Sequence, residues 1–312
     1  MSVHHDTVAG FHHSLEQERS VTVTKKHFPT VHREHYEDEL SFQPCEVLNR
    51  MNIAARLPVT VLMCTTLLAA CTAPSHQPIP ETAIPDARLV LPAPPVSGSA
   101  AQADDDRVFH ETRSLKDTPR WALAQRDADL EVPHLVKDFS CAVGYTLDLS
   151  KAPHLAAVLK QMENPIVHRT SEAKHYWHRT RPFVGTNLPI CTSPEGLGLH
   201  SSYPSGHTTA GYGMALLLAH LLPEHATMIL QRGRVFGESR IVCGAHWKSD
   251  VQAGFLNASS EMDTLLDAPE LQDDLIAARK ELRAMKGTTP APDAAECAIE
   301  VEAAAHSILS ER

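Results

Sequence analysis

The sequence predicts an all-α fold, a compact bundle of helices around one core. Aromatic residues make up only 5% of the chain, whereas alanine and leucine are abundant, and this composition favours helices over sheets. From Val108 onward, apolar residues recur at helical spacing, and no segment shows the alternation that is typical of a strand. With 312 residues, 43% of them hydrophobic, the chain can bury one sizeable core.

The first helix of the bundle is predicted to begin at Thr118. Thr118 is a favourable N-cap residue and Pro119 suits the first helical position, so residues 118–129 are expected to form a helix. Trp121 falls on its apolar side, and we expect this side chain in the core. Apolar periodicity predicts the next helical segments at residues 135–146, 153–163 and 164–181.

The second half of the chain predicts a loop followed by further helices. Prolines and glycines indicate a loop over residues 188–203. The apolar run from Gly213 to Leu222 is too short to cross a bilayer, which needs about 20 residues, so it is predicted to be a buried core helix. Residues 224–239 are expected to continue as helix, with Arg232 and Arg234 on the solvated face. The remaining helical segments are predicted at residues 247–256 and 259–285.

Residues 51–71 have the anatomy of a bacterial signal peptide, with a short charged start, an apolar run and small residues before a cleavage site. The end of this segment resembles a lipobox, in which Cys71 would be lipidated and become the mature N-terminus; cleavage without lipid is the alternative. A signal peptide that begins at residue 51 is out of place, so we expect Met51 to be the true start. Residues 1–50 would then be an over-extended start or a disordered segment.

Three further parts of the chain are expected to follow the signal peptide. Residues 72–106 contain seven prolines and end in three aspartates, which predicts a polyproline-like tether that holds the folded domain away from a membrane surface. The folded domain is expected over residues 107–285. Residues 286–312 are expected to form a loose tail, with room for a short helix around residues 294–309.

The chain has a net negative charge, but several positively charged residues are expected to lie close together. A formal net charge of −10 argues against a nucleic-acid partner. Lys174, Arg179, Arg181 and Arg240 nevertheless would focus positive potential in one cleft. Arg179 lies in the same neighbourhood but outside the spaced pattern described below, and we expect it to be a surface cation.

The number of cysteines indicates disulfides in the exported protein. If Cys45 and Cys64 are removed with their segments and Cys71 is lipidated, an even number of cysteines remains. Four cysteines can pair in three ways, and buried free thiols are the alternative. A bridge between Cys191 and Cys243 would stiffen the region that carries the motifs. The four remaining cysteines are Cys141, Cys191, Cys243 and Cys297.

Residues 239–250 are the most informative of three stretches that carry reactive side chains. His246 and Asp250 are four residues apart, so on a helix they share one face within hydrogen-bond reach. A carboxylate that accepts the Nδ1 proton of a histidine leaves Nε2 with a free lone pair, as a nucleophile or base requires. Arg240 adds a planar guanidinium that suits a phosphoryl group. Many His–Asp pairs at this spacing are structural, so this stretch alone does not establish a site.

Two upstream stretches complete the pattern. Residues 204–207, Pro-Ser-Gly-His, lead into the apolar helix, whose first amides and positive dipole end suit an anion. Lys174 and Arg181 are seven residues apart, so on a helix they would share a face about two turns apart. Pro182 would end that helix. Three cations, a helix start, two histidines and one carboxylate predict a site for a tetrahedral oxyanion.

These residues resemble the three-part signature of the type 2 phosphatidic acid phosphatase (PAP2) superfamily, and every signature position is filled. The resemblance is closest to the class A bacterial non-specific acid phosphatases and covers roughly residues 86–285. It implies a helical bundle of the PAP2 and vanadium haloperoxidase type, with residues 89–95 docked on the domain as an extended arm. The matching motifs are Lys174-x6-Arg181-Pro182, Pro204-Ser205-Gly206-His207 and Ser239-Arg240-x5-His246-x3-Asp250, with further shared stretches at residues 117–120, 181–183 and 237–247.

The resemblance also implies a role for each motif residue. His246 Nε2 would attack phosphorus and form a phosphohistidine, with Asp250 orienting the ring. His207 would protonate the leaving alkoxide and then activate water. The sequence contains no metal-binding motif, so we expect a metal-free reaction without a cofactor. The phosphate-binding positions would be Lys174, Arg181, Ser205, Gly206 and Arg240.

The expected function is that of an exported acid phosphatase of broad specificity that acts on small phosphate monoesters with an acidic optimum. The signal peptide predicts a periplasmic or outer-membrane-anchored bacterial enzyme, with Cys71 as the membrane tether, and leaves a homo-oligomer open. Two other functions compete with this interpretation. A vanadate-dependent haloperoxidase-like enzyme uses a related pocket, but such chains are usually much larger. A non-catalytic phosphate-binding surface lipoprotein would need the cations but not both histidines and the aspartate.

Overall fold

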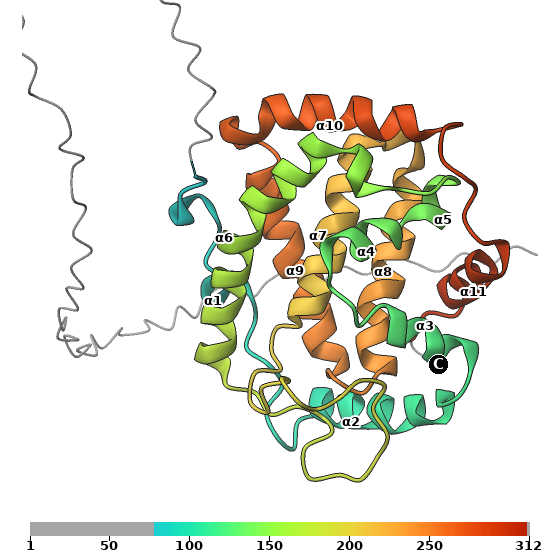
Figure 1. Ribbon diagram of the computed structural model, residues 1–312. Helices are drawn as coiled ribbons and strands as arrows, with labels where there is room; N and C mark the ends of the chain where they lie inside the picture. Colours follow the sequence, from blue (N-terminus) through green and yellow to red (C-terminus); the bar gives the residue numbers. More distant parts are fainter. Residues whose placement is uncertain (1–77, 311–312) are drawn as a thin grey trace, which may run out of the picture. The chain divides into compact units, whose positions relative to one another are not determined.

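The computed structural model describes residues 78–310, and this part of the chain is all-α, without a strand, as the sequence predicts. Helices α7, α8 and α9 pack against one another at the centre, α6 flanks them, and α10 crosses one end (Figure 1). Residues 1–50, the predicted signal peptide at 51–71 and its Cys71 lie outside the described residues. In chain order the helices are α1 (Ala87–Val90), α2 (Ala100–Thr112), α3 (Pro119–Arg126), α4 (Val132–Lys137), α5 (Ser140–Val143), α6 (Pro153–Trp177), α7 (Gly206–Leu221), α8 (Ala226–Val242), α9 (Lys248–Leu265), α10 (Gln272–Met285) and α11 (Ala294–Ala305).

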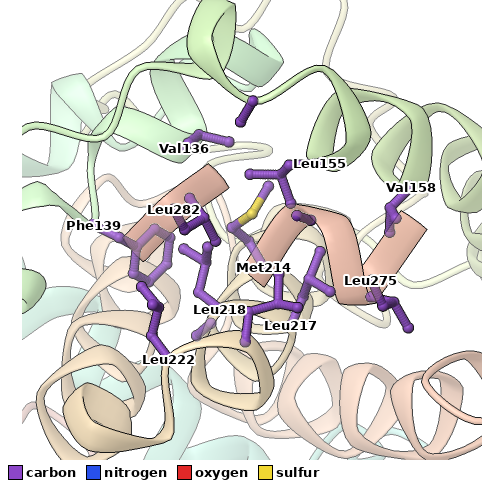
Figure 2. Close-up of a cluster of buried hydrophobic side chains, with 14 of the residues drawn as sticks. Val136, Phe139, Leu155, Val158, Met214, Leu217, Leu218, Leu222, Leu275 and Leu282 are labelled. Atoms are coloured by element: carbon purple, nitrogen blue, oxygen red, sulfur yellow. The ribbon is translucent and has the colours of Figure 1, made fainter. Parts of the chain in front are cut away.

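The hydrophobic core forms where α6, α7 and α10 meet the segment that carries α4 and α5. Helix α7 contributes most to it, because its sequence is apolar on nearly every face, as predicted for a buried core helix. Fully burying one such leucine stabilises a fold by about 1.5–3 kcal/mol. Ten of the core side chains are labelled in Figure 2: Val136, Phe139, Leu155, Val158, Met214, Leu217, Leu218, Leu222, Leu275 and Leu282.

Within residues 78–310, no single helix combines the length and the apolar composition of a transmembrane segment. Residues Gly206–Leu221 and Pro223–Val242 meet the length and composition test only as a pair, and the pair is bent by 119°.

The predicted helix over residues 164–181 differs from the observed helix at both ends. Helix α6 is continuous from Pro153 through Pro165 and ends at Trp177. His178 follows in the left-handed region, with φ of 47°, and turns the chain away from the helix axis. Arg181 therefore lies beyond the helix, and the prediction that it shares a helix face with Lys174 is wrong.

The predicted tether over residues 72–106 is wrong at its C-terminal end, because residues 100–106 belong to α2. Ser99 caps this helix by accepting a hydrogen bond from the Gln102 amide. Asp105 in α2 is buried, with 2% of its surface exposed, whereas the sequence suggested a solvated acidic run. Its burial depends on a partner about 70 positions away, described below, which composition alone does not reveal.

The segment before α2 docks on the domain, as the resemblance implied for residues 89–95. Ala87 and Leu91 are buried against Ala173 and Tyr203. The Tyr203 hydroxyl donates a hydrogen bond to the Pro92 carbonyl at 2.6 Å. Because Tyr203 precedes the Pro-Ser-Gly-His turn, this contact connects the arm to a predicted site motif.

The C-terminal segment is not the loose tail predicted for residues 286–312. Residues Ala294–Ala305 form α11, which confirms the short helix and which packs against α8 and α3. Two disulfides are present, Cys141–Cys297 and Cys191–Cys243. The first joins α5 to α11, the second confirms the bridge predicted near the motifs, and the free-thiol alternative is wrong.

Arg232 lies inside the protein, not on the solvated face of α8 that the sequence predicted. It is 4% exposed and donates to Asp127 Oδ1 at 2.6 Å. Glu300 of α11 contacts the same guanidinium at 3.2 Å. The charge is therefore paired from two elements that are distant in sequence, and this pairing makes its burial tolerable.

The burial of Glu261 in α9 predicts that the free energy of unfolding depends on pH. Burial raises its pKa from 4.5 to about 8, opposed in part by a hydrogen bond from Asn257. Its neutral form stabilises the fold fully below pH 4.5, and that contribution is lost as the pH rises towards 8, because only the unfolded chain then gives up the proton. Glu261→Gln should remove this part of the pH dependence, on the order of a few kcal/mol, since one pKa unit corresponds to about 1.4 kcal/mol. Denaturant unfolding of the wild type and of Glu261→Gln at pH 5 and pH 8 checks this prediction. An equal fall in the free energy of unfolding of both proteins between the two pH values would contradict it.

Candidate active site

His246 lies between α8 and α9, where a turn brings it back to the end of α8. Gly244, with φ of 74°, makes that turn, and the His246 amide donates to the Arg240 carbonyl at 3.3 Å. Arg181 Nη1 lies 3.0 Å from His246 Nε2. Because a guanidinium can only donate, Nε2 carries the lone pair and the ring proton is on Nδ1, which faces Asp250 Oδ2 at 3.4 Å.

Burial lowers the pKa of His246 well below 6.5, and the charges of Arg181, Lys174 and Arg240 lower it further. The imidazole is therefore neutral at pH 7, with its lone pair directed at the cations. Such a nitrogen is available to attack an electrophile that the cations hold in front of it.

Asp250 is held by donors other than His246. Its Oδ2 accepts from the Ser202 hydroxyl at 2.6 Å and from the Trp247 amide at 2.9 Å. Its Oδ1 accepts from Arg179 Nη1 at 2.7 Å. Asp250 is the third residue of α9, where a carboxylate satisfies the free amide of the N-cap residue. The orientation of the carboxylate is thus fixed before it meets the imidazole.

Arg179 is not the surface cation that the sequence predicted. It is 8% exposed and bridges Asp250 to Asp105 of α2, which accepts from Arg179 Nη2 at 2.7 Å. Ser249 strengthens the link between Arg179 and Asp105, because its hydroxyl accepts from Arg179 Nη1 at 2.6 Å and donates to Asp105 Oδ2 at 2.6 Å. No local pattern in the sequence distinguishes Arg179 from a surface cation, because its partner Asp105 lies 74 positions away.

Lys174 and Arg181 converge on the loop that precedes α7, although they do not share a helix. Lys174 Nζ donates to the Ser201 carbonyl at 2.6 Å, and Arg181 Nη2 reaches the same oxygen at 3.4 Å. Arg181 Nε also donates to the Gly198 carbonyl at 2.9 Å. Burial, with the charge of Arg181 next, lowers the pKa of Lys174 to about 7.

The start of α7 is held between two close helices. Ser205 is the N-cap, and its Oγ accepts from the Thr208 hydroxyl at 2.9 Å. A Cβ at Gly254 of α9 would overlap Thr208 and the Ser205 carbonyl, and a Cβ at Gly237 of α8 would overlap Thr208 from the other side. These glycines allow α8 and α9 to press on the first turn, so the amide of Gly206 has a fixed place.

His207 projects from that first turn. Its Nε2 lies 3.1 Å from the Ala128 carbonyl, which can only accept, so Nε2 carries a proton. Burial lowers the pKa of His207 well below 6.5, and the charge of Arg240 lowers it next. The second ring nitrogen, Nδ1, is left to exchange a proton.

Arg240 has the least satisfied side chain among these residues. It is 1% exposed, and its Nε and Nη1 have no hydrogen-bond partner within residues 78–310. Burial lowers its pKa to about 10, with the charge of Arg181 adding to the effect. A buried guanidinium without partners is costly, so its presence indicates an anion that satisfies it when bound. The neighbouring Ser239 donates to Asp127 and accepts from Arg120, which fixes this end of α8.

The structure therefore brings the predicted residues of all three stretches around His246, and adds Arg179 and Asp105 behind Asp250. Within residues 78–310, no group of three or more histidine, cysteine, aspartate or glutamate side chains is placed to hold a metal ion. The charges that act on His246 are those of Arg181, Lys174, Arg240 and His207. Such an arrangement can bind a tetrahedral dianion and present one neutral imidazole to its central atom.

Comparison with known proteins agrees with this geometry. Residues 156–259 match the family model described as the PAP2 superfamily. An acid phosphatase of Zymomonas mobilis is 50% identical over 220 residues, which are 70% of this chain and 83% of that protein. A non-specific acid phosphatase of Salmonella typhimurium is 36% identical over 72% of this chain and 90% of its own length, and one of Providencia stuartii is 37% identical over 64% and 82%.

Proposed function

Because this chain belongs to the PAP2 superfamily and is an acid phosphatase, we propose that it hydrolyses phosphate monoesters through a phosphohistidine on His246. The observation that carries the proposal is the convergence of a neutral His246 with Arg240, whose buried donors lack partners. A phosphate dianion would accept from Arg240, Arg181 and Lys174. The Ser205 hydroxyl, which already accepts from Thr208, has its own proton to donate, and the amide of Gly206, the first residue of α7, would be a further donor.

In the first step His246 Nε2 bonds to phosphorus while the bond between phosphorus and the ester oxygen breaks. His207 gives its proton to the departing oxygen, which leaves as an alcohol. Before this step, Arg181 Nη1 exchanges its contact with Nε2 for one with a phosphate oxygen. Phosphoryl transfer depends mainly on positioning and charge neutralisation, and fixed cations supply both.

In the second step the neutral His207 takes a proton from water, and the hydroxide oxygen bonds to phosphorus. The bond between phosphorus and Nε2 breaks, phosphate leaves, and His246 regains its lone pair. The Nδ1–H group of His246 donates a hydrogen bond to Asp250 throughout, and the carboxylate stabilises the positive charge of the phosphohistidine. Protonated His207 starts the cycle, and its lowered pKa means that its protonated share grows towards acid pH. We therefore expect kcat/KM to fall above neutral pH.

Hydrolysis of p-nitrophenyl phosphate at about pH 5.5 tests the function. We expect turnover that EDTA leaves unchanged, because no step requires a metal ion. Turnover of phenyl, alkyl and sugar phosphates would support broad specificity. Loss of activity with EDTA that a divalent cation restores, or a rate maximum well above pH 8, would contradict the proposal.

Arg179 is proposed as a positioning residue, because it holds the carboxylate that orients His246. Arg179→Gln should lower kcat by about 10- to 100-fold, the usual cost of removing a residue that orients a reactive group, with little change in KM. The acidic limb of the pH profile should shift, since Asp250 loses its nearest cation. Arg179→Lys should restore part of kcat by keeping that cation. A larger effect on KM than on kcat would contradict this role.

We also propose export, on the basis of the signal-peptide anatomy at residues 51–71 and the lipobox that ends at Cys71. The two disulfides support an oxidising compartment. In a bacterium this would be the periplasm, or the outer membrane if Cys71 is lipidated. Mass spectrometry of the natively expressed N-terminus checks both points, because an unprocessed chain that retains residues 51–71 would contradict export.

A further inference from the structure

An apolar cavity of about 180 Å³ lies between α4, α6, α7 and α9. Its walls are side chains of the hydrophobic core, and the mechanism uses none of them. Glu163 and the largely exposed Val167 of α6 lie at its edge, so it opens at the surface. Representative lining residues are Leu135, Met162, Met214, Leu217 and Met262.

Two residues that line the cavity stand close to His207 and to its hydrogen-bond partner Ala128. Ala210 lines it and stands three residues after His207 on α7, on the same face and about 4.5 Å further along the axis. Leu130 also lines it and lies two residues beyond Ala128, whose carbonyl accepts from His207. Because the proposed mechanism has His207 give its proton to the leaving oxygen of the ester, an apolar cavity this close to His207 is a candidate binding site for the leaving group.

The size of the cavity limits what it can hold. A cavity of about 150 Å³ lined by apolar side chains binds benzene. The present volume therefore fits one aromatic ring or a short alkyl chain, but not a long acyl chain.

One wall of the cavity is polar and incompletely paired. Glu261 lines it and is 1% exposed, and its Oε2 has no hydrogen-bond partner within residues 78–310. Its Oε1 accepts from Asn257 at 3.0 Å. Because burial raises the pKa of Glu261 to about 8, its carboxyl is neutral at acid pH and suits a hydroxyl group better than an ammonium group.

We propose that this cavity binds the alkyl or aryl group of a phosphomonoester substrate, with Glu261 Oε2 meeting a hydroxyl group at its far end. The inference rests on the proposed function and names its preferred substrate class. It predicts that the enzyme selects esters of medium-sized apolar alcohols over esters of very small or strongly polar ones.

A chain-length series tests the cavity in the intact enzyme. We expect kcat/KM to rise from ethyl through butyl to hexyl phosphate by up to about fourfold per CH₂, the value of burying one methylene. Hexyl phosphate with a terminal hydroxyl group should exceed hexyl phosphate in the wild type, and Glu261→Leu should remove that difference. A flat series would overturn the proposal.

Gly213 provides matched variants, because it lines the cavity and a Cβ there would meet only Met262, at 3.8 Å. Gly213→Leu should fill the cavity and flatten the series, with ethyl phosphate turnover unchanged. Gly213→Ala adds one methyl group and should keep most of the chain-length effect. A full chain-length effect in Gly213→Leu would place the alkyl group elsewhere and overturn the proposal.

Binding of hexylphosphonate and ethylphosphonate by calorimetry needs no variant and no turnover. We expect the hexyl compound to bind at least about tenfold more tightly to the wild type, in keeping with the value of each buried methylene. Equal affinities would overturn the proposal that the cavity binds the alkyl group, even if the enzyme is an active phosphatase. Tighter hexylphosphonate binding without hydrolysis of any ester would instead support alkyl binding in the cavity and contradict the proposed function.

Discussion

Replacing His246 by alanine should lower kcat by on the order of 10⁴-fold or more, the scale seen when a covalent nucleophile is removed. Its Nε2 carries a free lone pair and lies 3.0 Å from Arg181 Nη1, among the cations of the described site. The fold should survive, because the variant leaves Asp250 with three donors from Ser202, Trp247 and Arg179. Stopped assays with p-nitrophenyl phosphate and a thermal unfolding curve measure the two effects.

His220→Ala is the matched control for that variant. His220 lies in the last turn of α7, is exposed, and stands at the end of the helix opposite the site. We expect its kcat to stay within about twofold of the wild type, as for most surface changes. Equal losses in both variants would indicate damage to the fold, and retained turnover in His246→Ala would contradict the proposed nucleophile.

Replacing Arg240 by methionine should lower kcat/KM by about 10³- to 10⁵-fold while raising the free energy of unfolding. The first effect follows because an arginine that stabilises a transferring phosphoryl group contributes about that much. The second follows because the wild-type protein buries a charge whose Nε and Nη1 have no hydrogen-bond partner in the described part of the chain. Replacing such a group by an apolar side chain often stabilises by about 1–4 kcal/mol. Activity and stability should therefore move in opposite directions.

Arg107→Met is the control for the loss of one positive charge. Arg107 lies on α2 with 46% of its side chain exposed, paired to Asp104 and Glu111. Its removal should change kcat/KM little and should not raise the free energy of unfolding. If Arg240→Met were strongly destabilised, the guanidinium would have an internal structural role, and its proposed function in anion binding would lose its main support.

Much of the fold could be predicted because local signals agree with it. Thr118 and Pro119 open α3 as a cap and first turn, and the apolar run at residues 213–222 becomes the buried part of α7. The spacing of His246 and Asp250 predicts the contact between their side chains, although His246 lies in the turn before α9 and only Asp250 lies on the helix. These features depend on residues close in sequence, where periodicity and capping are informative.

The incorrect predictions share a different cause, which is the pairing of charged side chains that are distant in sequence. Arg179 and Arg232 looked solvated because each partner, Asp105 or Asp127, lies about 75 to 105 positions away. Composition made residues 100–106 look like a polar tether for the same reason, although Asp105 is buried by Arg179. A buried ion pair leaves no periodic signal, so only the packed structure reveals it.

The end of α6 shows how an incorrect element can still give a useful site prediction. Lys174 and Arg181 were expected to meet because both would lie on one helix face. The helix ends at Trp177, and they meet because the loop carbonyl of Ser201 accepts from both side chains. The motif spacing identified the pair, whereas the geometry that joins them depends on the loop before α7.

Trapping the covalent intermediate tests the central claim most directly. The His207→Ala variant should still lose p-nitrophenolate, which needs no proton to depart, but should be slow to activate water, so the intermediate should accumulate. Rapid quenching in alkali, which preserves phosphohistidine, followed by peptide mass spectrometry should locate phosphate on His246. Phosphate on any other residue, or a burst of p-nitrophenolate without a phosphorylated peptide, would contradict the account.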